Sequence, residues 1–107
     1  NVSNKPGFIT NLPGHAAVEV PCYIDAEGIH PCYIGELPEQ LAALNRSNAS
    51  EQILMAKAAN EKKKQYIHQA VMMDPFVGAQ CTLEQITNMM DELIASHEAD
   101  GYLADFE

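Results

Sequence analysis

The stretch from Thr82 to His97, TLEQITNMMDELIASH, gives the strongest structural signal in the chain. Thr82 and Gln85 have the spacing of a capping box, in which the threonine hydroxyl accepts a hydrogen bond from the Gln85 amide and the Gln85 side chain accepts one in return. Apolar side chains then recur at the spacing of one helix face: Ile86, Met89, Met90, Leu93 and Ile94. This pattern predicts a helix with one buried face.

Two more helical stretches are expected upstream of this helix. One follows Gly35, has Pro38 in its first turn, where a proline is tolerated, and continues to about Asn60. The other carries apolar side chains on one side and ends at Asp74-Pro75, because the residue before a proline disfavours the α conformation. Residues 36–97 are therefore predicted to be mainly helical.

Residues 16–34 have the pattern of a β-hairpin. Apolar residues alternate along the first arm: Val18, Val20, Cys22 and Ile24. The tetrapeptide DAEG at residues 25–28 has turn chemistry, and the chain can then run back as the second arm. Pro21 and Pro31 lack an amide hydrogen for a ladder, so a twisted, partly open ribbon is expected rather than a broad sheet.

These elements predict an α+β fold with one β-hairpin and about three helices. At 107 residues the chain is long enough for one domain with a modest core. Residues 1–14, rich in Asn, Gly and Pro, are expected to be a connector, and residues 98–107 an acidic tail. The polar start without Met fits a piece cut from a longer chain.

Composition excludes several classes of partner. The formal net charge of -9 would repel a phosphate backbone, so nucleic acid is not expected as a partner. No apolar stretch approaches the roughly 20 residues of a membrane span, and the amino terminus has no signal-peptide core. Three cysteines form no disulfide framework, so free thiols in the cytoplasm are expected.

Spacing alone identifies no reaction in this sequence. Cys22, His30 and Cys32 lie on the two arms of the expected hairpin and could approach one another, but they match no zinc motif, and packed free thiols are the simpler interpretation. There is no glycine-rich nucleotide loop of either standard pattern. The many carboxylates lie on solvated faces of the expected helices or in the tail.

Three strings carry a resemblance to a known family. The segment from Gly7 to Pro21, GFITNLPGHAAVEVP, is similar to a stretch with an N-L-P core and a V-E-V-P ending in family 4 glycosidases. The next residues, CYIDAEGIHPCYIGELPEQLAALNRSN, resemble the alpha-galactosidase and alpha-glucosidase branch. The string QAVMMDPFVGAQCTLEQITNMMDEL is similar to that branch's A-V-M-x-D-P element and final helix. The likeness covers nearly the whole chain.

This resemblance implies a role as the carboxyl-terminal region of a longer cytoplasmic enzyme. Such enzymes hydrolyse O-glycosidic bonds by oxidation and elimination with NAD and manganese. The resemblance implies part of a lactate dehydrogenase-like α+β domain that contacts an upstream Rossmann-type domain, a sugar substrate and other subunits of a homo-oligomer. Family residues that bind NAD or metal lie upstream, so no catalytic, cofactor or metal residue is assigned here. Asn11-Leu12-Pro13 and the hairpin are expected to help shape the substrate side of the cleft, with Asn11 as the candidate residue.

Two other hypotheses remain at this point. The chain could be a free-standing acidic helical module that binds a protein partner through its Met-rich stripe. It could also be a small metal-binding protein that uses Cys22, His30 and Cys32. Gly14-His15 and the run Ser47 to Ser50 depart from the family pattern and leave the subfamily, and with it the sugar and anomer, open.

Overall fold

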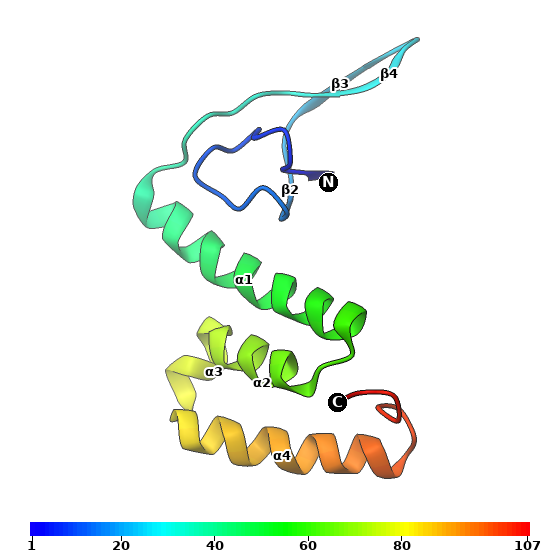
Figure 1. Cartoon of the computed structure of the whole chain (residues 1–107). Coiled ribbons are helices and arrows are strands. Elements are labelled where there is room, and N and C mark those ends of the chain that lie inside the picture. The colour runs from blue at the N-terminus through cyan, green and yellow to red at the C-terminus, as the bar shows by residue number, and fades with distance from the viewer. The chain divides into compact units, whose positions relative to one another are not determined.

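Four helices and two separate two-stranded antiparallel sheets make up the protein, which confirms the expected α+β class (Figure 1). The computed structural model describes all residues, 1–107, and forms two compact units, residues 1–49 and residues 50–107. The elements are β1 (Val2–Ser3), β2 (Ala17–Val18), β3 (Cys22–Asp25), β4 (Gly28–Pro31), α1 (Glu39–Glu61), α2 (Lys64–Met73), α3 (Pro75–Gln80) and α4 (Leu83–Ala99).

Residues 1–14, which were expected to be a connector, lie within an organised loop. β1 pairs antiparallel with β2, with Val2 opposite Val18 and Ser3 opposite Ala17. The side chain of Asn4 is completely buried at the centre of this loop. The composition of this segment favours turns. The buried side-chain amide of Asn4 bonds to the surrounding backbone and holds these turns in one ordered loop.

The bonds of Asn4 account for this order. Its Nδ2 atom donates to the carbonyl oxygens of Ile9 at 2.9 Å, Leu12 at 3.2 Å and Pro13 at 3.3 Å. Its Oδ1 atom accepts from the Ile9 amide at 3.0 Å. A buried amide with all of its polar atoms bonded costs little desolvation and fixes the backbone around it.

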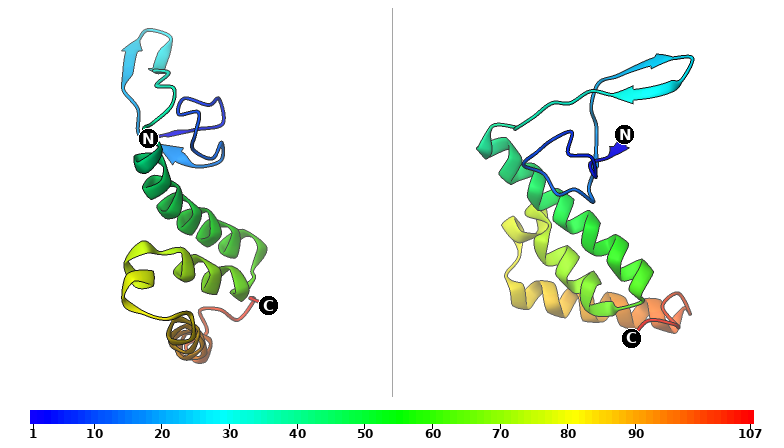
Figure 2. Two further views of the ribbon diagram at one scale, coloured as in Figure 1. Left: turned by 90° about the vertical axis from the view of Figure 1, so that its left-hand side faces the viewer. Right: turned by 45° about the horizontal axis from the view of Figure 1, so that its top comes forward.

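The β-hairpin is shorter than residues 16–34. β3 and β4 pair in register, Cys22 opposite Pro31 and Asp25 opposite Gly28, and appear as two adjacent arrows in both views of Figure 2. Val18 was expected in the first arm, but it belongs to β2, which pairs with β1 instead. Pro21 explains the interruption, since it cannot donate to a ladder and restricts the residue before it.

A two-residue turn joins β3 to β4, as the tetrapeptide at 25–28 predicts. The Asp25 Oδ1 atom accepts a hydrogen bond from the Glu27 amide at 2.8 Å, and Gly28 has φ of 130°. That backbone conformation is open to glycine and strained for other residues.

Helix α4 begins with the predicted capping box. The Thr82 amide donates to Gln85 Oε1 at 2.8 Å, and the Gln85 amide donates to the Thr82 hydroxyl at 3.2 Å. Its buried face forms the core of the second unit with α2, α3 and the segment after α4. The core residues are Ile86, Met90 and Ile94, packed against Ile67, Val71, Met72, Val77, Cys81 and Leu103.

The predicted stop at Asp74-Pro75 is confirmed, but a short helix, α3, follows it directly. The Asp74 carboxylate accepts hydrogen bonds from the amides of Phe76 at 2.8 Å and Val77 at 3.4 Å. Asp as an N-cap followed by Pro in the first turn is a helix-start signal, so the same dipeptide ends α2 and begins α3.

Residues after α4 turn back and bond to the start of α2. The Glu107 amide donates to the Lys62 carbonyl oxygen at 2.8 Å, and the Lys64 amide donates to the Glu107 carbonyl oxygen at 2.9 Å. The Lys62 ammonium lies 4.9 Å from the centre of the Phe106 ring. The expected acidic tail therefore has backbone and side-chain contacts, and Glu98 belongs to α4.

Candidate substrate-side loop

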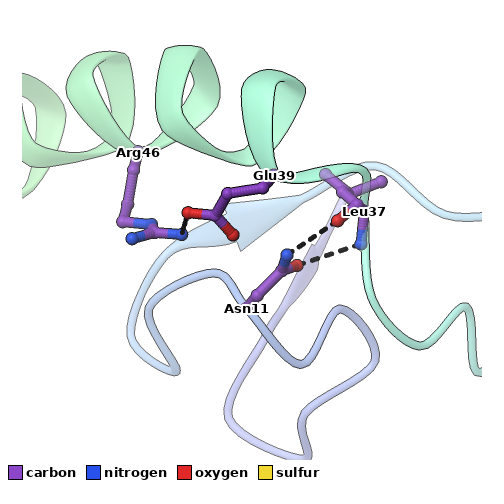
Figure 3. A network of polar contacts seen from close by, with 4 residues as sticks. All are labelled: Asn11, Leu37, Glu39 and Arg46. Atoms are coloured by element: carbon purple, nitrogen blue, oxygen red, sulfur yellow. Dashed lines mark hydrogen bonds and ion pairs between the residues drawn. The ribbon is translucent and has the colours of Figure 1, made fainter.

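Asn11, the candidate residue that the resemblance implies for the substrate side, joins the amino-terminal loop to the segment before α1 (Figure 3). Its Nδ2 atom donates to the Leu37 carbonyl oxygen at 2.8 Å, and its Oδ1 atom accepts from the Leu37 amide at 3.0 Å. The side-chain amide thus pairs with one backbone residue as a neighbouring strand would. We call this pair the Asn11 clamp.

Backbone bonds next to the clamp fix the same connection. The Phe8 carbonyl oxygen accepts from the amides of Ile34 at 2.9 Å and Gly35 at 3.1 Å, and the Thr10 amide donates to the Gly35 carbonyl oxygen at 3.0 Å. Gly35 has φ of 85°, which a residue with a side chain rarely adopts. Residues 8–11 and 34–37 therefore form one continuous contact between the loop and the end of the hairpin region.

One ion pair lies beside the clamp at the start of α1. Arg46 Nη2 and Glu39 Oε1 are 3.3 Å apart and lie on the same helix face, seven residues from each other along α1 (Figure 3). Both side chains are largely exposed, and exposed pairs contribute about 0.2–1 kcal/mol to stability. The Asn11 clamp, with two bonds to backbone atoms in a half-buried position, is the stronger determinant of loop position.

The hairpin carries a second polar cluster, formed by Asp25, His30 and Tyr23. His30 Nε2 lies 2.8 Å from Asp25 Oδ1, and the His30 ring stacks on Tyr23 at a centroid distance of 4.9 Å. The hydrogen bond from His30, followed by the bond from the Glu27 amide, lowers the pKa of Asp25 below its ordinary value of 3.8. These contacts stabilise the carboxylate and tie the two arms together.

The structure does not assemble Cys22, His30 and Cys32 into a metal centre. In the hairpin register Cys22 faces Pro31 and His30 faces Tyr23, so Cys22 and His30 lie on opposite faces of the ribbon. No group of three His, Cys, Asp or Glu side chains in the chain has the arrangement that a metal ion needs. All three cysteines are free thiols, which agrees with the expectation from their number and spacing.

Sequence reasoning missed two residues that organise the structure. Asn4 holds the loop that contains Asn11, and the only signal is its place in a turn-rich Ser-Asn-Lys-Pro-Gly run, which does not indicate burial. His68 joins α2 to α4, with Nε2 2.9 Å from Asp91 Oδ1. Neither position differs in its local pattern from solvated polar residues nearby.

Fold and sequence together identify the class of protein, a family of glycosidase carboxyl-terminal domains. The match to the family described as "Family 4 glycosyl hydrolase C-terminal domain" covers residues 1–77. The chain belongs to this family, which confirms the resemblance found in the sequence. The free-standing interaction module is accordingly not favoured.

Curated relatives support the same assignment. An alpha-galactosidase of Bacillus subtilis (strain 168) is 50% identical over 97 residues, which are 91% of this chain and 22% of the relative. An alpha-galactosidase of Rhizobium meliloti (strain 1021) is 38% identical over 90% of this chain and 19% of the relative. The chain therefore spans about a fifth of the length of these relatives.

Solved structures show the same fold. A 6-phospho-alpha-glucosidase from gut microorganisms, in complex with NAD and glucose-6-phosphate, matches 99% of this chain and 23% of its own with a TM-score of 0.78 and 25% identity. A second 6-phospho-alpha-glucosidase structure, in complex with NAD and Mn²⁺, matches 91% of this chain and 22% of its own with a TM-score of 0.76 and 22% identity. None of the four helices here has the length and hydrophobicity of a membrane span.

Proposed function

We propose that this chain is the carboxyl-terminal part of a longer alpha-galactosidase of family 4, which hydrolyses O-glycosidic bonds by NAD- and manganese-dependent oxidation and elimination. The observation that carries the proposal is the 50% identity to an alpha-galactosidase over 91% of this chain. Relatives that act on other sugars match less well: the alpha-glucosidase of Erwinia rhapontici and the probable 6-phospho-beta-glucosidase of Bacillus subtilis are each 31% identical. An alpha-galactoside is therefore the favoured substrate.

The residues of this chain do not fit NAD or a metal ion. The sequence has no glycine-rich phosphate loop, and the structure has no cluster of metal ligands. Both groups would be held by residues outside the chain, in an upstream nucleotide-binding domain. The contribution of this chain is then to shape the cleft and to contact the other parts of the enzyme.

Asn11 has a positioning role in this proposal. Both polar ends of its amide bond to the Leu37 backbone, so the side chain acts by holding the loop on the substrate side. A loop tied at residues 4 and 11 keeps its shape without help from substrate, which reduces the entropy lost on binding.

Exposed apolar side chains in the second unit support contacts with the rest of the enzyme or with other subunits of a homo-oligomer. Phe76 is 74% exposed and Leu83 is 64% exposed, and Met55, Met73 and Leu93 are each more than 40% exposed. Apolar surface of this extent is typical of a region that another chain or domain covers. Free thiols support a cytoplasmic location.

The test is an assay of the full-length gene product beside this chain, on aryl alpha-galactosides and alpha-glucosides, with and without NAD and Mn²⁺. We expect cleavage of the alpha-galactoside only by the long product and only with both additions. Cleavage that needs neither addition, or no cleavage of any glycoside, would refute the proposal.

A variant of the full-length enzyme separates the role of the clamp from general stability. Asn11→Ala removes both bonds to Leu37 and should raise KM more than it lowers kcat, because it loosens a binding surface. Asn48→Ala is the matched control, since Asn48 is exposed on α1 and its amide bonds only within the helix, to the Leu44 carbonyl oxygen. Equal effects of the two variants would show that Asn11 has no special role.

A further inference from the structure

Lys5 differs from every other Lys and Arg side chain in the protein, because it has no acidic partner. The other five are paired: Arg46 with Glu39, Lys57 with Glu61, Lys62 with Asp105, Lys63 with Glu61 and Lys64 with Glu98. The chain has 15 Asp and Glu residues against six Lys and Arg. Although the chain is strongly acidic, no carboxylate lies within ion-pair distance of the Lys5 ammonium.

Lys5 borders a recess of about 480 Å³ that contains a second basic side chain. Ser3, Lys5, Gly14 and His15 line it, and none of them is acidic. The imidazole of His15 has no hydrogen-bond or ion-pair partner in the protein, and neither do the backbone amides of Gly14 and His15. The residues that line the recess therefore carry several unpaired donors and the Lys5 charge, and none of them is acidic.

The walls of the recess are fixed before any ligand binds. The Asn4 amide donates to the Ala16 carbonyl oxygen at 2.9 Å, and Ser3 pairs with Ala17 across β1 and β2. The buried side chain of Asn4 holds the intervening loop. Residues 3–5 and 14–16 consequently lie side by side, and donors held in place by the fold bind an anion at a lower entropic cost than mobile surface groups do.

We propose that this recess binds a small oxyanion, the phosphate or carboxylate group of a low-molecular-weight ligand. A phosphate group accepts several hydrogen bonds and attracts a lysine ammonium as a point charge, and backbone amides complete such sites in many proteins. The inference rests on this chain alone and does not depend on the proposed glycosidase activity.

The test is an NMR titration of the isotope-labelled chain with inorganic phosphate, at an ionic strength kept constant with sodium chloride. We expect saturable shifts at the amides of Ser3, Lys5, Gly14 and His15. Lys5→Gln and His15→Gln should each weaken the apparent affinity about two- to fivefold, the range for one exposed charge contact. Lys57→Gln removes the same charge elsewhere and should leave the affinity unchanged.

Three further ligands identify the source of the oxyanion. Glucose-6-phosphate tests a phosphorylated sugar, galacturonate tests a sugar carboxylate, and galactose is the uncharged control. Shifts with either charged sugar and none with galactose support the proposal. Shifts that sodium chloride alone reproduces, or equal affinities of Lys5→Gln and Lys57→Gln for phosphate, overturn it. The dispersion of the amide spectrum shows directly that each variant is folded.

Discussion

At the scale of single residues, two asparagines contribute most to the order of the amino-terminal unit. The side-chain amides of Asn4 and Asn11 bond to main-chain atoms, as backbone amides do in a β-sheet. In each residue the Nδ2 atom donates and the Oδ1 atom accepts. Because these bonds go to main-chain atoms, they do not depend on which side chains the partner residues carry. Their loss, however, leaves buried backbone groups without partners, which costs more than the bond itself contributes.

Replacement of Asn4 by alanine should therefore destabilise the first unit. The change removes four hydrogen bonds at a completely buried position and leaves the Ile9 amide without its partner. We expect a loss of about 2–3 kcal/mol in the free energy of unfolding, measured by urea denaturation.

Asn48→Ala, at an exposed position on α1, is the control for the Asn4 variant and should change stability by less than about 0.5 kcal/mol. If the two variants unfold at the same urea concentration, the buried amide does not hold the loop.

The Asp25 and His30 pair should give the hairpin an acid-dependent stability. The pKa of Asp25 is lowered in the folded protein, so the unfolded chain binds its proton at higher pH than the folded chain does. The stabilising contribution is then complete above the ordinary value of 3.8 and is lost as pH falls through the lower folded pKa.

Carboxyl NMR titration of Asp25 measures this effect directly. His30→Gln should move the Asp25 pKa back toward its ordinary value, because it removes the largest cause of the shift. The Glu27 amide would remain as a donor, so a small depression should persist. An unchanged Asp25 pKa in the variant would contradict the assignment.

At the scale of elements, the sequence predicts best those helices and turns whose determinants are local. The capping box at Thr82, the stop at Asp74 and the turn at residues 25–28 each depend on residues within one or two turns, and all three are present in the structure. The pairing of β2 with β1 was missed, because it joins segments about fifteen residues apart with only two residues in each strand.

The capping box permits a clean stability measurement. Thr82→Ala removes the hydroxyl that accepts the Gln85 amide and should cost about 1 kcal/mol in thermal or urea unfolding. Thr87→Ala is the comparison within the same helix, since its hydroxyl bonds to the Leu83 carbonyl oxygen, which already takes part in the helix. A larger loss from Thr87→Ala than from Thr82→Ala would show that the cap is not the main determinant.

At the scale of the whole molecule, the sequence identified the family and the absence of a nucleotide loop, but not the division into two units. Helix α1 is continuous in sequence pattern and in structure, and residues on it belong to both units. The sequence near residue 49 has no proline, glycine or run of charges, so no sequence pattern predicts a boundary between units there. The Asn11 clamp also could not be predicted from the sequence, since its partners are the backbone amide and carbonyl oxygen of a residue 26 positions away.

The exposed apolar side chains predict how the isolated chain behaves in solution. Because Phe76, Leu83 and the apolar side chains of the hairpin, including Ile24 at 75% exposure, have no cover in this chain, we expect self-association that increases with concentration. Sedimentation velocity over a concentration series measures it. A strictly monomeric species throughout would contradict the expectation.

The Asn11 clamp also makes the two positions it joins unequal in their tolerance of substitution. Position 37 contributes an amide hydrogen and a carbonyl oxygen, which every amino acid except proline supplies. Position 11 contributes a planar amide of one length, so even glutamine, with one more methylene, displaces the donor and the acceptor together. Mutational scanning should accordingly show that few residues are tolerated at position 11 and that many are tolerated at position 37.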